Sequence, residues 1–285
     1  MKQREPIVCR NNRIPARRRK VTGRDSNKAW KTATARAIGT SHTARGIPCQ
    51  DSILAQANRL PFVIACDGRG SASKSELGSE AGTRAFAELI NLHADQVSDI
   101  LGNRRRKPST RKLRWKELVH HHFLPGMVNV IKKLSSSMEI PSAEFEFTVS
   151  AAVIGRKYLG WIQLGDGGLI TVEGRKCRLL CRPQIGEYAN QTYFVSEGRE
   201  SEKIVQSGVM PSGRIRAVYA HTDGLTPRFY DLRDHKPGPA FTQIADRLSS
   251  GSWSQHSLES LLIHSCWKSA TDDDRSVAVI YQLIT

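Results

Sequence analysis

Strand-like apolar segments that end or begin at an acidic residue are the feature of this sequence that most constrains its fold. Three are followed by Asp67-Gly68, Asp166-Gly167 and Asp223-Gly224, and the acidic triplet 272–274 precedes a fourth, Arg275–Tyr281. A single Asp-Gly pair predicts only a turn, because glycine accepts positive φ without steric cost. Four acidic strand ends in one chain, however, can place oxygen ligands at one rim of a sheet, as a hard divalent cation requires.

Apolar periodicity predicts an α+β fold with two packed, mostly antiparallel β-sheets and helices outside them. Helical spacing covers residues 74–101 and 115–134, and Pro125 is expected to kink or interrupt the second helix. Residues 34–41 indicate a strand, and residues 146–195 divide into short strands separated by turn residues. Because strands and helices come in blocks, we expect the sheets to pack on each other with helices in the outer layers.

Other elements are expected on either side of these segments. Residues 51–56 and 62–66 indicate a β-hairpin. Residues 240–249 and 255–268 favour helices, and Val277–Ile284 favours a closing strand.

The excess of basic residues lies in two segments. Of the formal net charge of +16, residues 1–29 contribute +8 (ten Lys or Arg against two acids) and residues 103–116 contribute +8 (eight Lys or Arg and no acid). The rest of the chain is therefore neutral, which excludes a uniformly basic nucleic-acid binder. We expect residues 1–29 to form a disordered arm, residues 30–285 to form one domain, and the segment 103–116, interrupted by Pro108, to form a loop.

Several classes of protein are excluded by the motifs they would need. None of the six cysteines has an arginine six positions later, so the Cys-x5-Arg loop of cysteine phosphatases is missing. The phosphate-binding Gly-x4-Gly-Lys-Ser/Thr loop and the Gly-x-Ser-x-Gly elbow are missing too. No run of eighteen apolar residues occurs, so no membrane span is expected, and the scattered cysteines suit a reducing cytoplasm.

The order of the acidic motifs resembles that of the metal-dependent protein serine/threonine phosphatases (type 2C, or PPM), in particular the bacterial type. The motifs are Gln50-Asp51, Asp67-Gly68-Arg69-Gly70, Gly165-Asp166-Gly167, Thr222-Asp223-Gly224 and Asp273-Asp274-Arg275-Ser276. The resemblance covers residues 34–283 and implies a four-layer αββα sandwich for the domain 30–285. It also implies that the segment 182–212 is a flap beside the site.

The resemblance further implies a site for two Mn²⁺ or Mg²⁺ ions. By this resemblance Asp67 bridges both ions, Gly68 offers its backbone carbonyl, and Asp223 and Asp273 bind one ion. Asp166 takes the position that often helps to hold a third ion. Asp51 matches the acidic residue that orients metal-bound water, and Asp272 is expected to be solvated.

Three departures from the family pattern concern the site. Gln50 stands where many members have Glu, and it cannot supply a negative charge. Arg69 replaces the His of eukaryotic members and stays protonated, so it cannot act as a general acid, although it could clamp phosphate. The phosphate-binding arginine usually lies five residues before the acid, whereas Arg45 lies six before Asp51. Arg45 is our candidate for this role, His42 is a second, and a solvated loop arginine is the alternative reading.

The function implied is hydrolysis of phosphoserine and phosphothreonine in proteins through a metal-bridging hydroxide. A phosphorylated protein substrate and a cognate Ser/Thr kinase are then the expected partners. The alternative is a weakly active or inactive binding module with the same fold, which Gln50 and Arg69 favour. The basic arm leaves contact with nucleic acid or with an acidic partner open.

Overall fold

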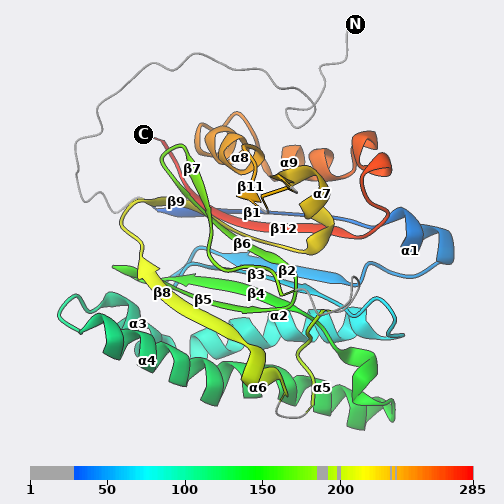
Figure 1. Cartoon of the computed structure of the whole chain (residues 1–285), viewed down its shortest axis with the longest axis horizontal. Coiled ribbons are helices and arrows are strands. Elements are labelled where there is room, and N and C mark those ends of the chain that lie inside the picture. Colours follow the sequence, from blue (N-terminus) through cyan, green and yellow to red (C-terminus); the bar gives the residue numbers. More distant parts are fainter. Residues whose placement is uncertain (1–28, 185–191, 198–199, 232, 235, 285) are drawn as a thin grey trace, which may run out of the picture.

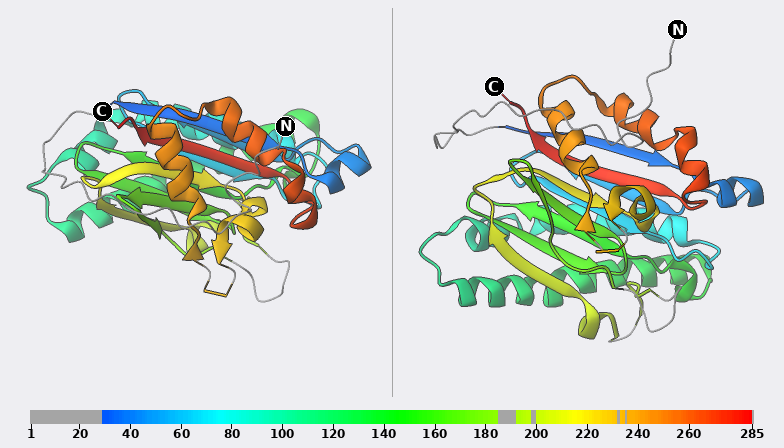
Figure 2. Two further views of the ribbon diagram at one scale, coloured as in Figure 1. Left: turned by 90° about the horizontal axis from the view of Figure 1, so that it is seen from above. Right: turned by 45° about the horizontal axis from the view of Figure 1, so that its top comes forward.

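A computed structural model describes residues 29–184, 192–197, 200–231, 233–234 and 236–284 (Figure 1). Two five-stranded antiparallel sheets lie face to face, and helices cover the outer face of each (Figures 1 and 2). The predicted four-layer αββα sandwich is therefore confirmed. The arm expected over residues 1–29 lies, apart from Ala29, outside the described residues.

The first sheet joins the two ends of the described chain. Its strands occur in the spatial order β1 (Trp30–Ala37), β12 (Arg275–Gln282), β9 (Ile215–His221), β6 (Gly168–Glu173) and β7 (Lys176–Leu179). Because β12 lies between β1 and β9, the segment before β12 is drawn to the same end of the sheet as the end of β9.

The second sheet carries the predicted hairpin. Its strands occur in the order β2 (Asp51–Gln56), β3 (Phe62–Asp67), β4 (Val149–Ile154), β5 (Tyr158–Leu164) and β8 (Gln206–Pro211). All six residues of β4 are buried, since one face of the strand meets the other sheet and the opposite face meets the helices. A short pair, β10 (Tyr230–Asp231) with β11 (Lys236–Pro237), stands apart.

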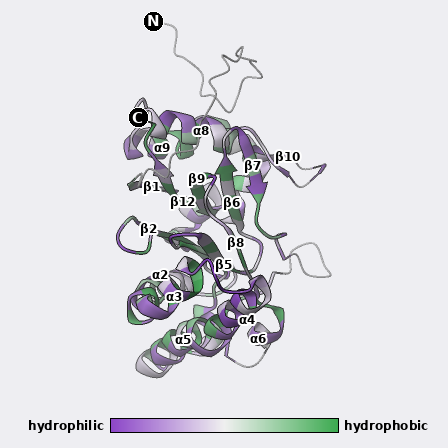
Figure 3. Cartoon of the chain, turned by 90° about the vertical axis from the view of Figure 1, so that its left-hand side faces the viewer, coloured by the Kyte–Doolittle hydropathy of each residue, from purple (hydrophilic) through white to green (hydrophobic). Residues whose placement is uncertain are grey.

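Three apolar clusters hold the layers together. The inter-sheet cluster uses small and β-branched side chains such as Val63, Ala65 and Ala278, which lets the two sheets approach closely. Larger side chains fill the helix-sheet layers, with Trp115 and Phe123 on one side and Phe241 and Trp267 on the other. In Figure 3 the hydrophobic colouring concentrates on the strands where the layers meet.

Helices of the outer layers follow the chain order. The second sheet is covered by α2 (Ser75–Leu92), α3 (Ala94–Gly102), α4 (Pro108–Leu118) and α5 (Leu124–Met138), and the first by α8 (Ala240–Ser249) and α9 (Gln255–Leu262). Three shorter helices are α1 (Thr40–Arg45), α6 (Glu200–Ile204) and α7 (Thr226–Phe229). Among the described residues, no helix combines the length and the apolar character needed to cross a membrane.

The basic segment 103–116 is mostly helical, so the expectation of a loop was wrong. Pro108 begins α4, a position that its fixed φ and missing N–H suit. Arg111, Trp115 and Leu118 are buried at helical spacing, and the Arg111 guanidinium donates to the carbonyls of Ile100, Asn103 and Arg106. These three hydrogen bonds satisfy the guanidinium, so Arg111 can occupy the buried face of the helix together with Trp115 and Leu118.

Several boundaries also differ from the predictions. The strand expected over 34–41 ends at Ala37, because Thr40–Arg45 turns into a helix. The helix expected over 74–101 is divided into α2 and α3 at His93. The helix interruption expected at Pro125 is present, but it takes the form of a π-helical turn at Val119–Phe123 just before α5.

The C-terminal part of the predicted flap is regular structure. Within 182–212, residues 200–204 form α6 and residues 206–211 form β8, the border strand of the second sheet. Residues 185–191 and 198–199 lie outside the described part. The helix expected over 255–268 ends at Leu262 and is followed by a 3₁₀ turn, Ser265–Ser269.

Candidate metal centre

The predicted acidic residues lie at strand ends of both sheets. Asp67 is the last residue of β3, and in the hairpin it is the direct partner of Asp51, the first residue of β2. Asp166 lies in the turn between β5 and β6, and Asp223 follows β9. Asp273 lies two residues before the start of β12. The sandwich therefore gathers at one end acids that are far apart in sequence.

Three of these acids form a compact group. Carboxylate oxygens of Asp67, Asp166 and Asp223 all lie within 4.8 Å of one another, and the three residues are half-buried. Each carboxylate is held by a different turn, so the group is assembled only by the packing of the two sheets. Oxygen-only donors at this spacing suit a hard divalent cation.

The carboxylates repel one another. Burial raises the pKa of Asp67 well above its usual value, and repulsion by Asp51 and Asp223 adds to the shift. Burial, followed by repulsion from Asp166 and Asp273, raises the pKa of Asp223 to about 7. Ionised carboxylates that are buried without a partner of opposite charge lower the stability of the folded protein, and bound cations would remove this penalty.

Two buried carboxylate oxygens have no hydrogen-bond partner among the described residues. They are Oδ1 of Asp51 and Oδ1 of Asp223. The other Asp51 oxygen accepts from the Thr222 hydroxyl at 2.8 Å, and that hydroxyl in turn accepts from the Ser276 amide at 3.1 Å. A buried carboxylate oxygen without a hydrogen-bond donor needs water or a cation as its partner. These oxygens therefore fit the Mn²⁺ or Mg²⁺ that the resemblance implies.

Asp273 lies beside this group but outside the set of three. Its negative charge raises the pKa of both Asp67 and Asp223, and its own pKa is raised mainly by burial. Its Oδ1 accepts from the Asp274 amide at 2.8 Å, which fixes the carboxylate. Asp272 is exposed, as expected.

Asp274, which was not predicted as a site residue, connects separate segments of the chain at this end of the sandwich. Asp274 accepts from the amides of Gly39 and Gln50, each at 2.7 Å, and its Oδ2 lies 2.9 Å from Nδ1 of His42. Its carboxylate thereby joins α1 and the start of β2 to the segment that carries Asp273. No local pattern marks Asp274, because all three partners are more than two hundred residues away.

Two glycines of the motifs are required by close packing. A Cβ at Gly224 would lie 1.9 Å from the carbonyl oxygen of Asp274. A Cβ at Gly68 would lie 2.7 Å from Oγ of Ser75, and the Gly68 amide donates to the Gln50 carbonyl at 3.1 Å. These contacts keep Asp67 and Asp223 in place.

Comparison with known proteins identifies the family. A profile of the family described as "Protein phosphatase 2C" matches residues 38–263. The chain belongs to this family. Membership makes it a metal-dependent protein phosphatase, in agreement with the acidic cluster.

Relatives of this type 2C domain include bacterial phosphatases. The chain is 24% identical over 263 residues to serine/threonine-protein phosphatase 3 of Escherichia coli K12. This alignment covers 88% of this chain and 98% of that protein. The catalytic domain of the phosphatase PstP, solved with two manganese ions, shares 12% identity with a TM-score of 0.56 over 90% of this chain and 99% of that one. A phosphatase 2C of Toxoplasma gondii shares 14% identity with a TM-score of 0.61 over 90% and 96%. These structures support the fold.

The candidate phosphate ligands of the type 2C domain have different surroundings. Arg45 is exposed at the end of α1, and its Nε donates to the Ser41 carbonyl in the same helix. His42 is buried against Asp274 instead of facing solvent. Arg69 is paired with Glu146 at 2.9 Å. Of the three side chains, that of Arg45 has no ion pair among the described residues.

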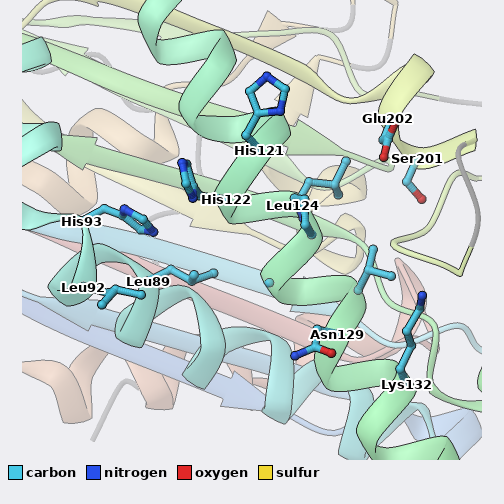
Figure 4. Close-up of a pocket in the computed structure, with 13 residues that line it drawn as sticks. Leu89, Leu92, His93, His121, His122, Leu124, Asn129, Lys132, Ser201 and Glu202 are labelled. Atoms are coloured by element: carbon cyan, nitrogen blue, oxygen red, sulfur yellow. The ribbon is translucent and has the colours of Figure 1, made fainter.

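His221, His121 and His122 do not join the acidic cluster of the type 2C domain. Burial lowers the pKa of His221 to about 4, and its ring bonds to the Tyr230 hydroxyl at 2.8 Å. His121 and His122 line a hollow of about 650 Å³ between α2, α5 and α6 (Figure 4). His122 faces His93 there, with ring centres 4.3 Å apart. None of the site acids lines this hollow.

Proposed function

We infer that the protein is a metal-dependent serine/threonine phosphatase that removes phosphate from phosphoserine and phosphothreonine in proteins. The observation that carries this conclusion is the convergence of Asp67, Asp166 and Asp223 within 4.8 Å in a type 2C domain. An inactive binding module is less favoured, because the acids that would hold the cations are all present.

We propose the following roles for the residues of the site. Asp67, the carbonyl of Gly68, Asp223 and Asp273 would hold two Mn²⁺ or Mg²⁺ ions. Asp166 contributes to a third, weaker site. Cations held there supply positive charge for the phosphoryl oxygens and make water more acidic.

Asp51 is proposed to orient the attacking water. The Thr222 hydroxyl fixes one of its oxygens, and the other is buried without a partner, so it is available to accept a hydrogen bond from water. The in-line direction of attack is then set by the β2–β3 hairpin, in which Asp51 lies directly opposite Asp67.

The phosphate contact is proposed to be Arg45. Its exposed guanidinium carries no ion pair among the described residues, whereas that of Arg69 is already bound to Glu146. Replacement of Arg45 by Ala should raise KM for a phosphopeptide about tenfold and leave the stability unchanged. An equal effect from Arg69→Ala with none from Arg45→Ala would transfer the role to Arg69.

Hydrolysis of para-nitrophenyl phosphate tests the function. With Mn²⁺ the wild-type protein should turn over, and Asp67→Asn should lower kcat at least a hundredfold. Asp272→Asn is the matched control, because this neighbouring acid is exposed. Absence of metal-dependent turnover in the wild-type protein would contradict the proposal and favour the binding module.

We also propose a reducing, cytoplasmic location and a Ser/Thr kinase as the enzyme that supplies the substrate. The location is supported by Cys177 and Cys181, which are both free thiols although only three residues separate them. The kinase follows from the chemistry, since a phosphoprotein substrate must first be phosphorylated.

A further inference from the structure

The border strand β8 has an outer edge without a strand partner in the described part of the chain. It closes its sheet and pairs with β5 alone, over six residues (Figure 1). Five of these residues are half-buried, and Pro211 is exposed. Such an edge presents alternate backbone N–H and C=O groups, which can pair with one more extended segment.

A basic groove runs beside this edge. It has a volume of about 360 Å³ and lies between β8 and α4, which are neighbours in Figures 1 and 3. Its lining comes from Lys112, Leu113, Lys116, Trp161 and residues 207–209. Leu113 is 56% exposed, so the groove offers apolar surface as well as charge.

The two lysines of the groove are not neutralised. Lys112 and Lys116 are exposed, and neither has a carboxylate partner among the described residues. They lie four residues apart on one face of α4, where like charges destabilise a helix. By contrast, Arg106 and Arg114 share Asp99. The unpaired positive charge of α4 therefore faces the groove, where an acidic ligand would relieve the repulsion.

One end of the strand lies at the acidic cluster. Gln206 is the register partner of Gln163, whose side-chain amide donates to the carbonyls on both sides of Asp166, at 3.1 Å from Gly165 and 2.8 Å from Gly167. A segment that paired along β8 would thus begin beside the turn that carries Asp166.

The other end of the strand lies at the basic loop. Pro211 is the register partner of Tyr158, whose ring lies 3.5 Å below the Arg111 guanidinium. Arg111 in turn holds the loop of residues 103–107. The paired strand spans roughly 17 Å. Lys112 and Lys116 line the groove beside residues 207–209, so positive charge accompanies the middle of this strand.

We propose that β8 (Gln206–Pro211), with Lys112 and Lys116, forms a docking strip for an extended acidic segment of the phosphoprotein substrate. This inference rests on the proposed phosphatase function. The protein's own N-terminal arm is not the occupant, because residues 1–28 carry ten basic residues and repel the lysines. A peptide fits better than nucleic acid, since the strip combines a strand edge, apolar surface and two separate charges.

Two phosphothreonine peptides test the docking strip. One carries four glutamates beginning five residues from the phosphothreonine, a spacing of roughly 17 Å in an extended peptide, and the other carries glutamines there. The variant Lys112→Glu/Lys116→Glu should raise KM for the acidic peptide about tenfold, with kcat and para-nitrophenyl phosphate turnover unchanged. Methylation of alternate backbone nitrogens in the acidic segment should cause a similar loss in the wild-type protein.

A matched control is Lys132→Glu/Lys133→Glu, which makes the same charge change at two exposed positions of α5. Equal KM values of the wild-type protein for the two peptides, or equal effects of the two double variants, would overturn the inference. Two other results would also overturn it, if the wild-type protein shows no preference for the acidic peptide. One is binding of duplex DNA that is lost in Lys112→Glu/Lys116→Glu, and the other is a dimer in sedimentation that is lost in the same variant.

Fluorescence anisotropy of the labelled acidic peptide separates docking from catalysis. If the wild-type protein fails to hydrolyse para-nitrophenyl phosphate with Mn²⁺, the proposed function fails, while lysine-dependent binding still supports the strip. If hydrolysis is normal and the acidic peptide binds no better than the glutamine peptide, only the docking inference fails.

Discussion

Replacement of Asp223 by Asn should stabilise the metal-free protein while it weakens the metal-loaded one. Burial and the charges of Asp166 and Asp273 raise the pKa of Asp223 to about 7, against a value near 3.9 in an unfolded chain. A difference of about three pKa units corresponds to about 4 kcal/mol. This is an upper value, because removal of one charge lets the remaining carboxylates relax, and we expect about 2–4 kcal/mol.

The pH dependence has a definite sign. Since the folded-state pKa of Asp223 lies above the unfolded-state value, the folded protein binds the proton more tightly. Stability of the metal-free wild-type protein should therefore fall as pH rises from about 4 to about 7, and stay level above that range as far as this group is concerned. The advantage of Asp223→Asn should grow over the same window.

Thermal unfolding in EDTA measures this effect. At pH 8 the variant should melt roughly 4–16 °C above the wild-type protein, from about 2–4 °C per kcal/mol for a domain of this size. Mn²⁺ at a thousand times its Kd for the wild-type protein should reverse the order, since it stabilises by about 4.1 kcal/mol. Asp272→Asn, an exposed neighbour, should change neither curve. A variant that is less stable than wild type in EDTA at pH 8, or a stability difference independent of pH, would contradict the repulsion assigned to Asp223.

Three further predictions concern the frame of the site. Gly224→Ala should destabilise the protein by about 1–3 kcal/mol in urea unfolding, because the new methyl group meets the Asp274 carbonyl at 1.9 Å; an unchanged midpoint would contradict this packing. His42→Ala should lower the free energy of unfolding by about 1–3 kcal/mol, because the buried Asp274 carboxylate loses a partner at 2.9 Å. An unchanged free energy of unfolding in the same assay would argue against this contact. Chelation should abolish para-nitrophenyl phosphate turnover, and Mn²⁺ but not K⁺ should restore it; turnover that survives extensive chelation would exclude a role for the cations.

The site could be predicted from the sequence where an acidic residue directly follows an apolar, strand-like segment. Apolar strands that end at Asp67 and Asp223 could be recognised from local residues alone, and the structure brings these two acids together with Asp166. Their assignment as ligands remains a prediction, as does the role of Asp51. Periodicity also gave α8 over residues 240–249, because one face of that helix is uniformly apolar.

Local patterns failed where a residue acts through distant partners. The start of α4 was missed because Pro108 was expected to interrupt the segment, although it begins the helix. The buried face also includes Arg111, a residue that satisfies its charge on three backbone carbonyls of the preceding segment. The edge of β8 was mistaken for part of a flap, since nothing in residues 206–211 shows that their partner is β5.

Most strands, the helices α2, α5, α8 and α9, and the acids at the strand ends could be read from the sequence, because hydrophobic period and turn residues act over short distances. The folded chain was needed to show that Asp274 joins α1 to the start of β2, and that a strand edge with two lysines, unpaired among the described residues, leads away from the acidic cluster. These features depend on contacts between segments up to 235 residues apart, which no local pattern can encode.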